Sequence, residues 1–81
     1  MFEGRKYKQE GGYSSRAVRF ADIDGGVCTT TYSYSLSHDE RFEMARRIAA
    51  ALNYTTNLST EQMEGAEPLP SIQTSVLKDQ L

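Results

Sequence analysis

Residues 13–36 have the sequence YSSRAVRFADIDGGVCTTTYSYSL. Two stretches rich in aromatic and β-branched residues flank Asp24-Gly25-Gly26 in this segment. Apolar stretches on either side of a glycine-containing turn are typical of a β-hairpin. The segment therefore predicts two antiparallel strands joined by a short loop.

The apolar side chains indicate the length of the hairpin loop. A two-residue turn would divide them between the two faces of the hairpin, which is costly when one face is buried. A three-residue loop pairs Ile23 with Val27 and lets Gly26 take the positive φ that a bulged loop requires. The predicted core face is then formed by Val18, Phe20, Cys28, Tyr32, Tyr34 and Leu36. The opposite face is formed by Arg19, Ala21, Thr29, Thr31 and Ser33.

A third strand is predicted within Phe2–Gln9, joined to the hairpin through Glu10-Gly11-Gly12 as a meander. The exposed edges of such a small sheet invite pairing with another chain, so a homodimer or larger homo-oligomer is expected.

The segment after the hairpin has the pattern of an amphipathic helix. Ser37 and Glu40 have the spacing of a capping box, which marks a helix N-terminus. Glu43 and Arg47 are four residues apart and are expected to form a surface ion pair. The helix is predicted to end near Asn53. Its apolar stripe consists of Phe42, Ala45, Ile48, Ala49 and Leu52, and we expect it to cover the hairpin.

A second capping box at Ser59–Gln62, followed by Gly65, predicts a helix of one or two turns. Residues 1–65 are therefore expected to form a single α+β domain, a hairpin or three-stranded meander packed on one main helix. Residues 66–81 read as a proline-containing linker followed by a tail or a short helix, because Pro68 and Pro70 break regular structure.

Composition limits the class of protein. The chain has 81 residues and a formal net charge of −2, and it contains no apolar run long enough to span a bilayer. The first residues lack the apolar stretch of a secretory signal, so we expect a cytoplasmic protein. One cysteine and one histidine give no zinc-binding set of any recognised spacing.

Two sets of residues belong to types that bind metals or catalyse reactions. Asp22 and Asp24 begin like a calcium loop, but Ser33 stands where a bidentate glutamate is needed. Cys28 and His38 lie at opposite ends of a strand and are predicted to be too far apart to act together. We therefore expect a non-catalytic protein that needs no cofactor.

Two kinds of binding surface remain. Basic residues and tyrosines alternate in the N-terminal half, a pattern that suits nucleic acid or a nucleotide. Tyrosine and arginine are also enriched at protein interfaces. The candidate partner-binding residues are Tyr7, Tyr13, Arg16, Arg19, Arg46, Arg47 and Tyr54.

The segment from Glu40 to Asn53, ERFEMARRIAAALN, is followed by LSTEQME at residues 58–64. This pattern resembles small uncharacterised bacteriophage and prophage accessory proteins, in which a helix ends in an Ile-plus-Asn segment and a capped turn follows. The resemblance covers residues 38–64. It implies a phage protein that binds and inhibits a host protein, such as a component of an antiviral defence system, in the manner of an anti-CRISPR protein. The N-terminal half leaves the nucleic-acid or nucleotide hypothesis open beside it.

Overall fold

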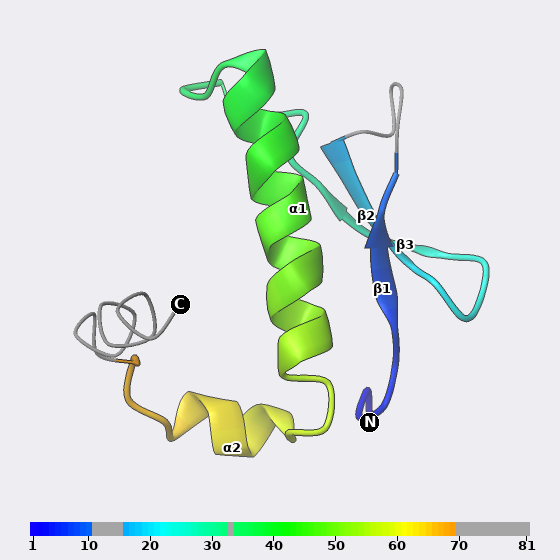
Figure 1. The fold of residues 1–81 in the computed structure, drawn as a ribbon, viewed down its shortest axis with the longest axis vertical. Coiled ribbons are helices and arrows are strands. Elements are labelled where there is room, and N and C mark those ends of the chain that lie inside the picture. Colours follow the sequence, from blue (N-terminus) through cyan, green and yellow to red (C-terminus); the bar gives the residue numbers. More distant parts are fainter. Residues whose placement is uncertain (11–15, 33, 70–81) are drawn as a thin grey trace, which may run out of the picture.

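A computed structural model describes residues 1–10, 16–32 and 34–69 of the chain. Three strands form one antiparallel sheet in the order β1-β2-β3, and α1 packs against β1 and β2 (Figure 1). The elements are β1 (Tyr7–Gln9), β2 (Ala17–Phe20), β3 (Gly26–Thr29), α1 (His38–Tyr54) and α2 (Thr60–Glu64). The predicted α+β fold and the meander are confirmed.

The main helix begins where its capping box predicts. The Glu40 N–H donates to Ser37 Oγ at 3.2 Å, and the Ser37 N–H donates to Glu40 Oε1 at 2.8 Å. The hydrogen bond from the Ser37 backbone lowers the pKa of Glu40 because it favours the ionised carboxylate. The helix ends at Tyr54, one residue beyond the predicted end.

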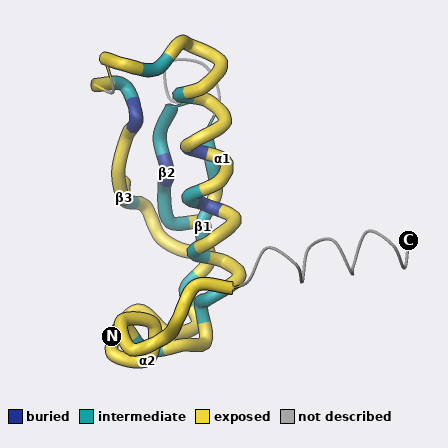
Figure 2. The backbone as a smooth tube through the Cα atoms, turned by 90° about the vertical axis from the view of Figure 1, so that its left-hand side faces the viewer, coloured by how far each residue is buried: buried dark blue, intermediate teal, exposed yellow. Residues whose placement is uncertain are grey.

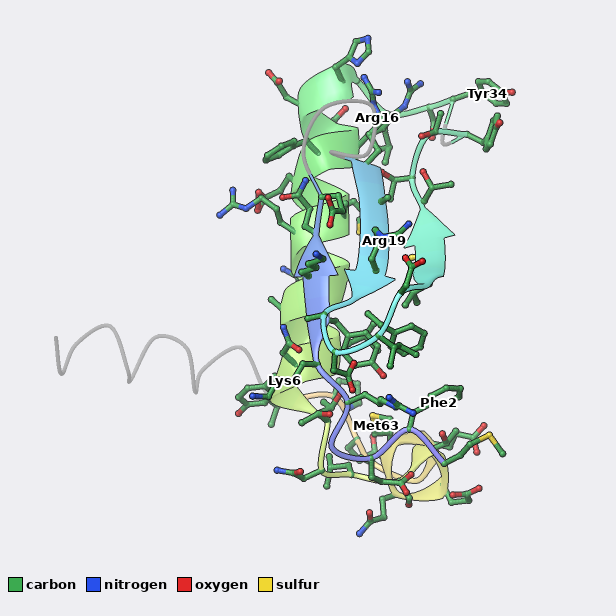
Figure 3. All side chains as sticks on the ribbon, turned by 90° about the vertical axis from the view of Figure 1, so that its right-hand side faces the viewer. Phe2, Lys6, Arg16, Arg19, Tyr34 and Met63 are labelled. Carbon is green, nitrogen blue, oxygen red and sulfur yellow. The ribbon has the colours of Figure 1, made fainter. Side chains whose placement is uncertain are left out.

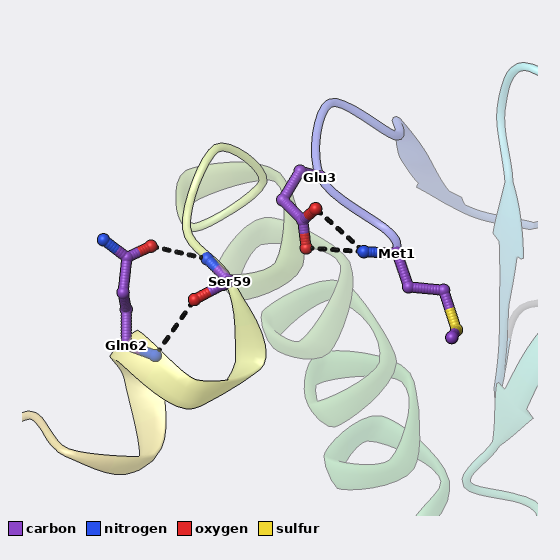
Figure 4. A network of polar contacts seen from close by, with 4 residues as sticks. All are labelled: Met1, Glu3, Ser59 and Gln62. Atoms are coloured by element: carbon purple, nitrogen blue, oxygen red, sulfur yellow. Dashed lines mark hydrogen bonds and ion pairs between the residues drawn. The ribbon is translucent and has the colours of Figure 1, made fainter.

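The short helix α2 is also confirmed. The Gln62 N–H donates to Ser59 Oγ at 3.1 Å, and the Ser59 N–H donates to Gln62 Oε1 at 2.8 Å (Figure 4). Gly65 follows as the C-terminal cap. Figure 4 also shows the Met1 ammonium group bound to the Glu3 carboxylate, a contact that lowers the pKa of Glu3.

A very small core joins the sheet to the helix. The buried apolar residues are Val18, Ala45 and Ala49, and Ile48 and Leu52 pack against them (Figure 2). The stripe of α1 is therefore confirmed at four positions. Phe42 departs from the prediction and is exposed, because the first turns of α1 extend past the strand ends (Figure 1).

The predicted hairpin register is wrong. Val18 lies opposite Cys28, and Arg19 lies opposite Gly26 across a bulge. Residues 21–25 connect the two strands, and the Phe20 N–H donates to the Gly25 carbonyl at 3.0 Å. Gly26 has no positive φ; among the described glycines only Gly4 does, at 80°.

Two ion pairs hold this longer loop. Arg5, which lies outside the hairpin, binds Asp22 at 3.0 Å, and Arg19 of β2 binds Asp24 at 2.8 Å. Asp22 and Asp24 are both held by ion pairs. Ile23 between them stays exposed and does not pair with Val27. Since Arg5 lies outside the hairpin, the pattern of the hairpin alone does not reveal the ion pair that holds Asp22.

The placement of three predicted core residues is also wrong. Cys28 is exposed, and Tyr32 and Tyr34 are 69% and 83% exposed. The reason is that β3 ends at Thr29, so the tyrosines follow the strand instead of continuing it. Figure 2 shows β3 beside α1 and not beneath it, so the helix does not cover this strand.

No helix among the described residues is both long enough and apolar enough to cross a bilayer. The predicted C-terminal tail or helix lies outside the described residues from residue 70 onward, and the domain limits at residues 65 and 66 stay a prediction.

Candidate functional site

A shallow groove of about 570 Å³ lies between β1 and α1. It brings together three of the seven predicted binding residues, Tyr7, Arg46 and Arg47. The complete lining is Tyr7, Lys8, Gln9, Glu43, Arg46, Arg47, Ala49, Ala50 and Asn53. The groove thus joins residues of β1 to residues of α1 that lie far apart in the sequence.

Helical periodicity explains why α1 presents these side chains together. Arg46, Ala50 and Asn53 recur at intervals of four and three residues, so they share one face of the helix. This face lies directly beside the buried pair Ala45 and Ala49, which holds α1 against the sheet. The core therefore places the groove side chains next to β1.

Asn53 closes one end of the groove. Its side-chain amide meets both backbone groups of Tyr7: Asn53 Nδ2 donates to the Tyr7 carbonyl and the Tyr7 N–H donates to Asn53 Oδ1, each at 2.8 Å. The two bonds fix the distance between α1 and β1. The sequence pattern did not identify Asn53 as a site residue. Asn53 is the last residue of the helical segment 40–53 that resembles phage accessory proteins.

The groove carries an excess of positive charge. Two basic side chains of α1, Arg46 and Arg47, line it together with the acidic Glu43, whereas Lys8 lies opposite Arg19 in the sheet and binds Glu10 at 2.9 Å. Arg46 binds Glu43 at 3.3 Å, where the prediction had paired Glu43 with Arg47. An exposed ion pair of this kind is worth little in water, so Arg46 can exchange Glu43 for a carboxylate of another molecule.

Tyr7 differs from its predicted role as a freely exposed contact residue. Its ring is half-buried and packs against Phe20, with the ring centroids 5.4 Å apart. The ring also packs against the core of Val18, Ala45 and Ala49, so it is held in place beside the groove.

The other predicted residues lie elsewhere. Arg19 projects from the sheet face turned away from α1 and pairs with Asp24 (Figure 3). Arg16 contacts the His38 ring at the start of α1. Tyr13 lies outside the described residues. The seven residues therefore do not form one site.

Tyr54 belongs to a second surface at the C-terminal end of α1. It lines an apolar hollow of about 460 Å³ together with Leu58, Met63 and Leu69. A smaller cavity of about 120 Å³ lies nearby, where Phe2 of the N-terminal segment approaches Met63 of α2 (Figure 3). These contacts tie α2 to the domain and leave Tyr54 itself 83% exposed.

The aspartates of the hairpin loop are engaged by arginines. The hydrogen bond from Arg5 lowers the pKa of Asp22, because the guanidinium favours the ionised carboxyl group. Among residues 1–10, 16–32 and 34–69 there is no group of three or more His, Cys, Asp or Glu side chains able to hold a metal ion. Cys28 lies on β3, whereas His38 contacts Arg16 at the start of α1.

Comparisons of the chain with protein families, with curated proteins and with solved structures found no match.

Proposed function

We propose that this chain is a non-catalytic bacteriophage accessory protein that binds a host protein and inhibits it, the target being a component of an antiviral defence system. The observation that carries the binding function is the cationic groove between β1 and α1. The phage origin and the kind of target rest on the resemblance of residues 38–64.

The form of the groove suits a protein surface. Small-molecule sites are concave and enclose most of the ligand. Here the lining is shallow and mainly polar, with a fixed tyrosine ring beside two arginines. Tyrosine and arginine dominate the residues that carry binding energy in protein interfaces. The excess of positive charge favours an acidic segment of the partner.

The nucleic-acid or nucleotide hypothesis places the ligand on basic residues of the N-terminal half, and three of these already form ion pairs. Arg5, Lys8 and Arg19 each bind an acidic side chain, at 3.0, 2.9 and 2.8 Å. A phosphate group would have to replace these carboxylates, just as an acidic protein segment would have to replace Glu43 at Arg46, so the ion pairs do not decide between the two hypotheses. Binding of nucleic acid through this half would also fall steeply with salt.

The test is affinity purification of the tagged chain from bacterial lysate, with proteins and bound nucleotides identified by mass spectrometry. Three forms are compared: the native chain, the double variant Arg46→Glu/Arg47→Glu and the control Lys6→Glu. The control changes a charge of the same sign outside the groove.

The proposal expects one host protein at stoichiometric amount with the native chain and with Lys6→Glu, and its loss with the double variant. Inhibition is then measured on that host protein directly. Capture of a nucleotide or nucleic acid without a protein would support the alternative instead. Equal capture of the host protein by all three forms would show that the groove does not bind it.

A further inference from the structure

An apolar hollow lies where α1 and α2 end. It has a volume of about 460 Å³, and its lining includes Tyr54, Leu58, Met63 and Leu69, all of which are exposed. α2 turns across the C-terminal end of α1 and forms one side of the hollow (Figure 1). Single exposed apolar side chains are common on proteins, whereas a contiguous group of them marks an interaction surface. The hollow is therefore suited to an apolar occupant.

The charge around the hollow argues against the kind of partner that the groove favours. Between residues 48 and 69 the sequence contains Glu61, Glu64 and Glu67 but no lysine or arginine. Glu67 lines the hollow itself. Neither α1 nor α2 has a basic residue in its last turn, so the partial negative charge of each helix C-terminus is not neutralised there. An acidic segment is repelled from the hollow, and its occupant must carry no excess of negative charge.

The chain continues directly from the rim of the hollow. Leu69 is the last described residue before segment 70–81, and its side chain lines the hollow. Pro68 and Pro70 restrict the backbone on both sides of Leu69, which lowers the entropy that this connection loses on docking. A segment attached at so short a distance has an effective concentration on the order of millimolar at the hollow. It therefore needs a far weaker affinity for the hollow than a separate partner does.

The sequence of segment 70–81, PSIQTSVLKDQL, matches the hollow in polarity. At about 100° per residue, its large apolar side chains all fall on one half of a helical surface. These side chains are Ile72, Val76, Leu77 and Leu81, and the other half carries Ser71, Thr74, Ser75, Lys78 and Asp79. Because the charges of Lys78 and Asp79 cancel, the side chains of the segment add no net charge beside Glu67.

We infer that segment 70–81 folds back onto the hollow of its own chain and covers Tyr54, Leu58 and Met63 with its apolar half. The segment then removes this surface from solvent. Tyr54 is used within the chain and not for a partner, while the groove between β1 and α1 stays open to one.

The direct test is a nuclear Overhauser experiment on the full-length chain with isotope-labelled methyl groups. The Met63 methyl group should show contacts to the methyl groups of Val76 and Leu77. In a mixture of labelled and unlabelled chain, these contacts should stay within one copy. Contacts between copies would make a second copy the occupant and overturn the inference, as would the absence of any contact.

Binding of Nile red, a neutral dye that fluoresces on apolar surfaces, measures whether the hollow is covered. Val76→Asp/Leu77→Asp should uncover the hollow and raise the fluorescence of the bound dye by about 3-fold. The control Thr74→Asp/Ser75→Asp adds the same charge at neighbouring positions on the polar half, and should keep the native fluorescence. The amide signals of β1, β2 and β3 should be the same in all three forms, which shows that the sheet stays folded.

Equal dye fluorescence of the native chain and Val76→Asp/Leu77→Asp would contradict the covering of the hollow. If Leu58→Asp then also lost a captured host protein, the hollow would belong to that partner instead. Arg46→Glu/Arg47→Glu changes no residue of the hollow and should keep the methyl contacts of the native chain. Conversely, Val76→Asp/Leu77→Asp should capture the host protein as the native chain does. The two proposals can thus fail separately.

Discussion

The side chain of Asn53 forms two hydrogen bonds with the backbone of Tyr7. It both accepts from the Tyr7 N–H and donates to the Tyr7 carbonyl at 2.8 Å, as a neighbouring strand would. The contact joins the last turn of α1 to the outer edge of β1, across 46 positions of the sequence. It also occupies an edge that would otherwise be free to pair.

Replacing Asn53 by alanine should destabilise the domain. The variant loses both hydrogen bonds from the Asn53 side chain to the Tyr7 backbone, so we expect the free energy of unfolding to fall by about 1–2 kcal/mol. Chemical denaturation measures the change, and hydrogen exchange should show faster exchange of the Tyr7 amide. The matched control Asn57→Ala removes an exposed asparagine and should change stability by less than about 0.5 kcal/mol. Equal effects of the two substitutions would contradict the assigned role.

Thr30 provides the second tie between sheet and helix. It is the one buried polar residue among those described, and its hydroxyl donates to the Arg41 carbonyl of α1 at 2.7 Å. Thr30→Val keeps the volume and loses the hydroxyl, so we expect a loss of about 1–2 kcal/mol in denaturation experiments. Thr29→Val, at the exposed neighbouring position, removes only hydrogen bonds with Thr31 that water can replace, and should cost much less. A neutral Thr30→Val would show that the hydroxyl does not hold α1.

The capping box makes the helix sensitive to acid. The Ser37 backbone lowers the pKa of Glu40 in the folded protein below its value in the unfolded chain. A group with a lowered pKa stabilises the fold above its unfolded pKa, and that stability is lost as the pH falls through the folded value. We expect the helical signal in circular dichroism to weaken between about pH 5 and pH 3. Glu40→Gln keeps a cap acceptor without a titrating group and should flatten this dependence; an unchanged profile would contradict it.

The helices could be predicted because their signals are local. Ser37 with Glu40 and Ser59 with Gln62 form their caps within four residues, and the sequence alone contains all the partners. The alternation of Val18 and Phe20 likewise predicted which side of β2 faces the helix. The packing of Ala45 and Ala49 against that side follows from the helical spacing.

The hairpin register could not be predicted, because it depends on residues far along the chain. Asp22 is held by Arg5, which belongs to the N-terminal segment. The alternation of residues 28–36 predicted a longer buried strand, but α1 covers only part of the sheet and Tyr32 and Tyr34 were left outside it. For the same reason, three of the seven predicted binding residues share the groove and Tyr54 lies apart.

The most direct test of the central claim is to map the partner's contact surface on the chain by nuclear magnetic resonance. Isotope-labelled chain is titrated with the captured host protein, and the amide signals are followed residue by residue. We expect the shifts to concentrate on β1 and on α1 around Arg46 and Arg47, and Arg46→Glu/Arg47→Glu to abolish them. Shifts confined to the hollow around Tyr54 and Met63, with the double variant still binding, would contradict it.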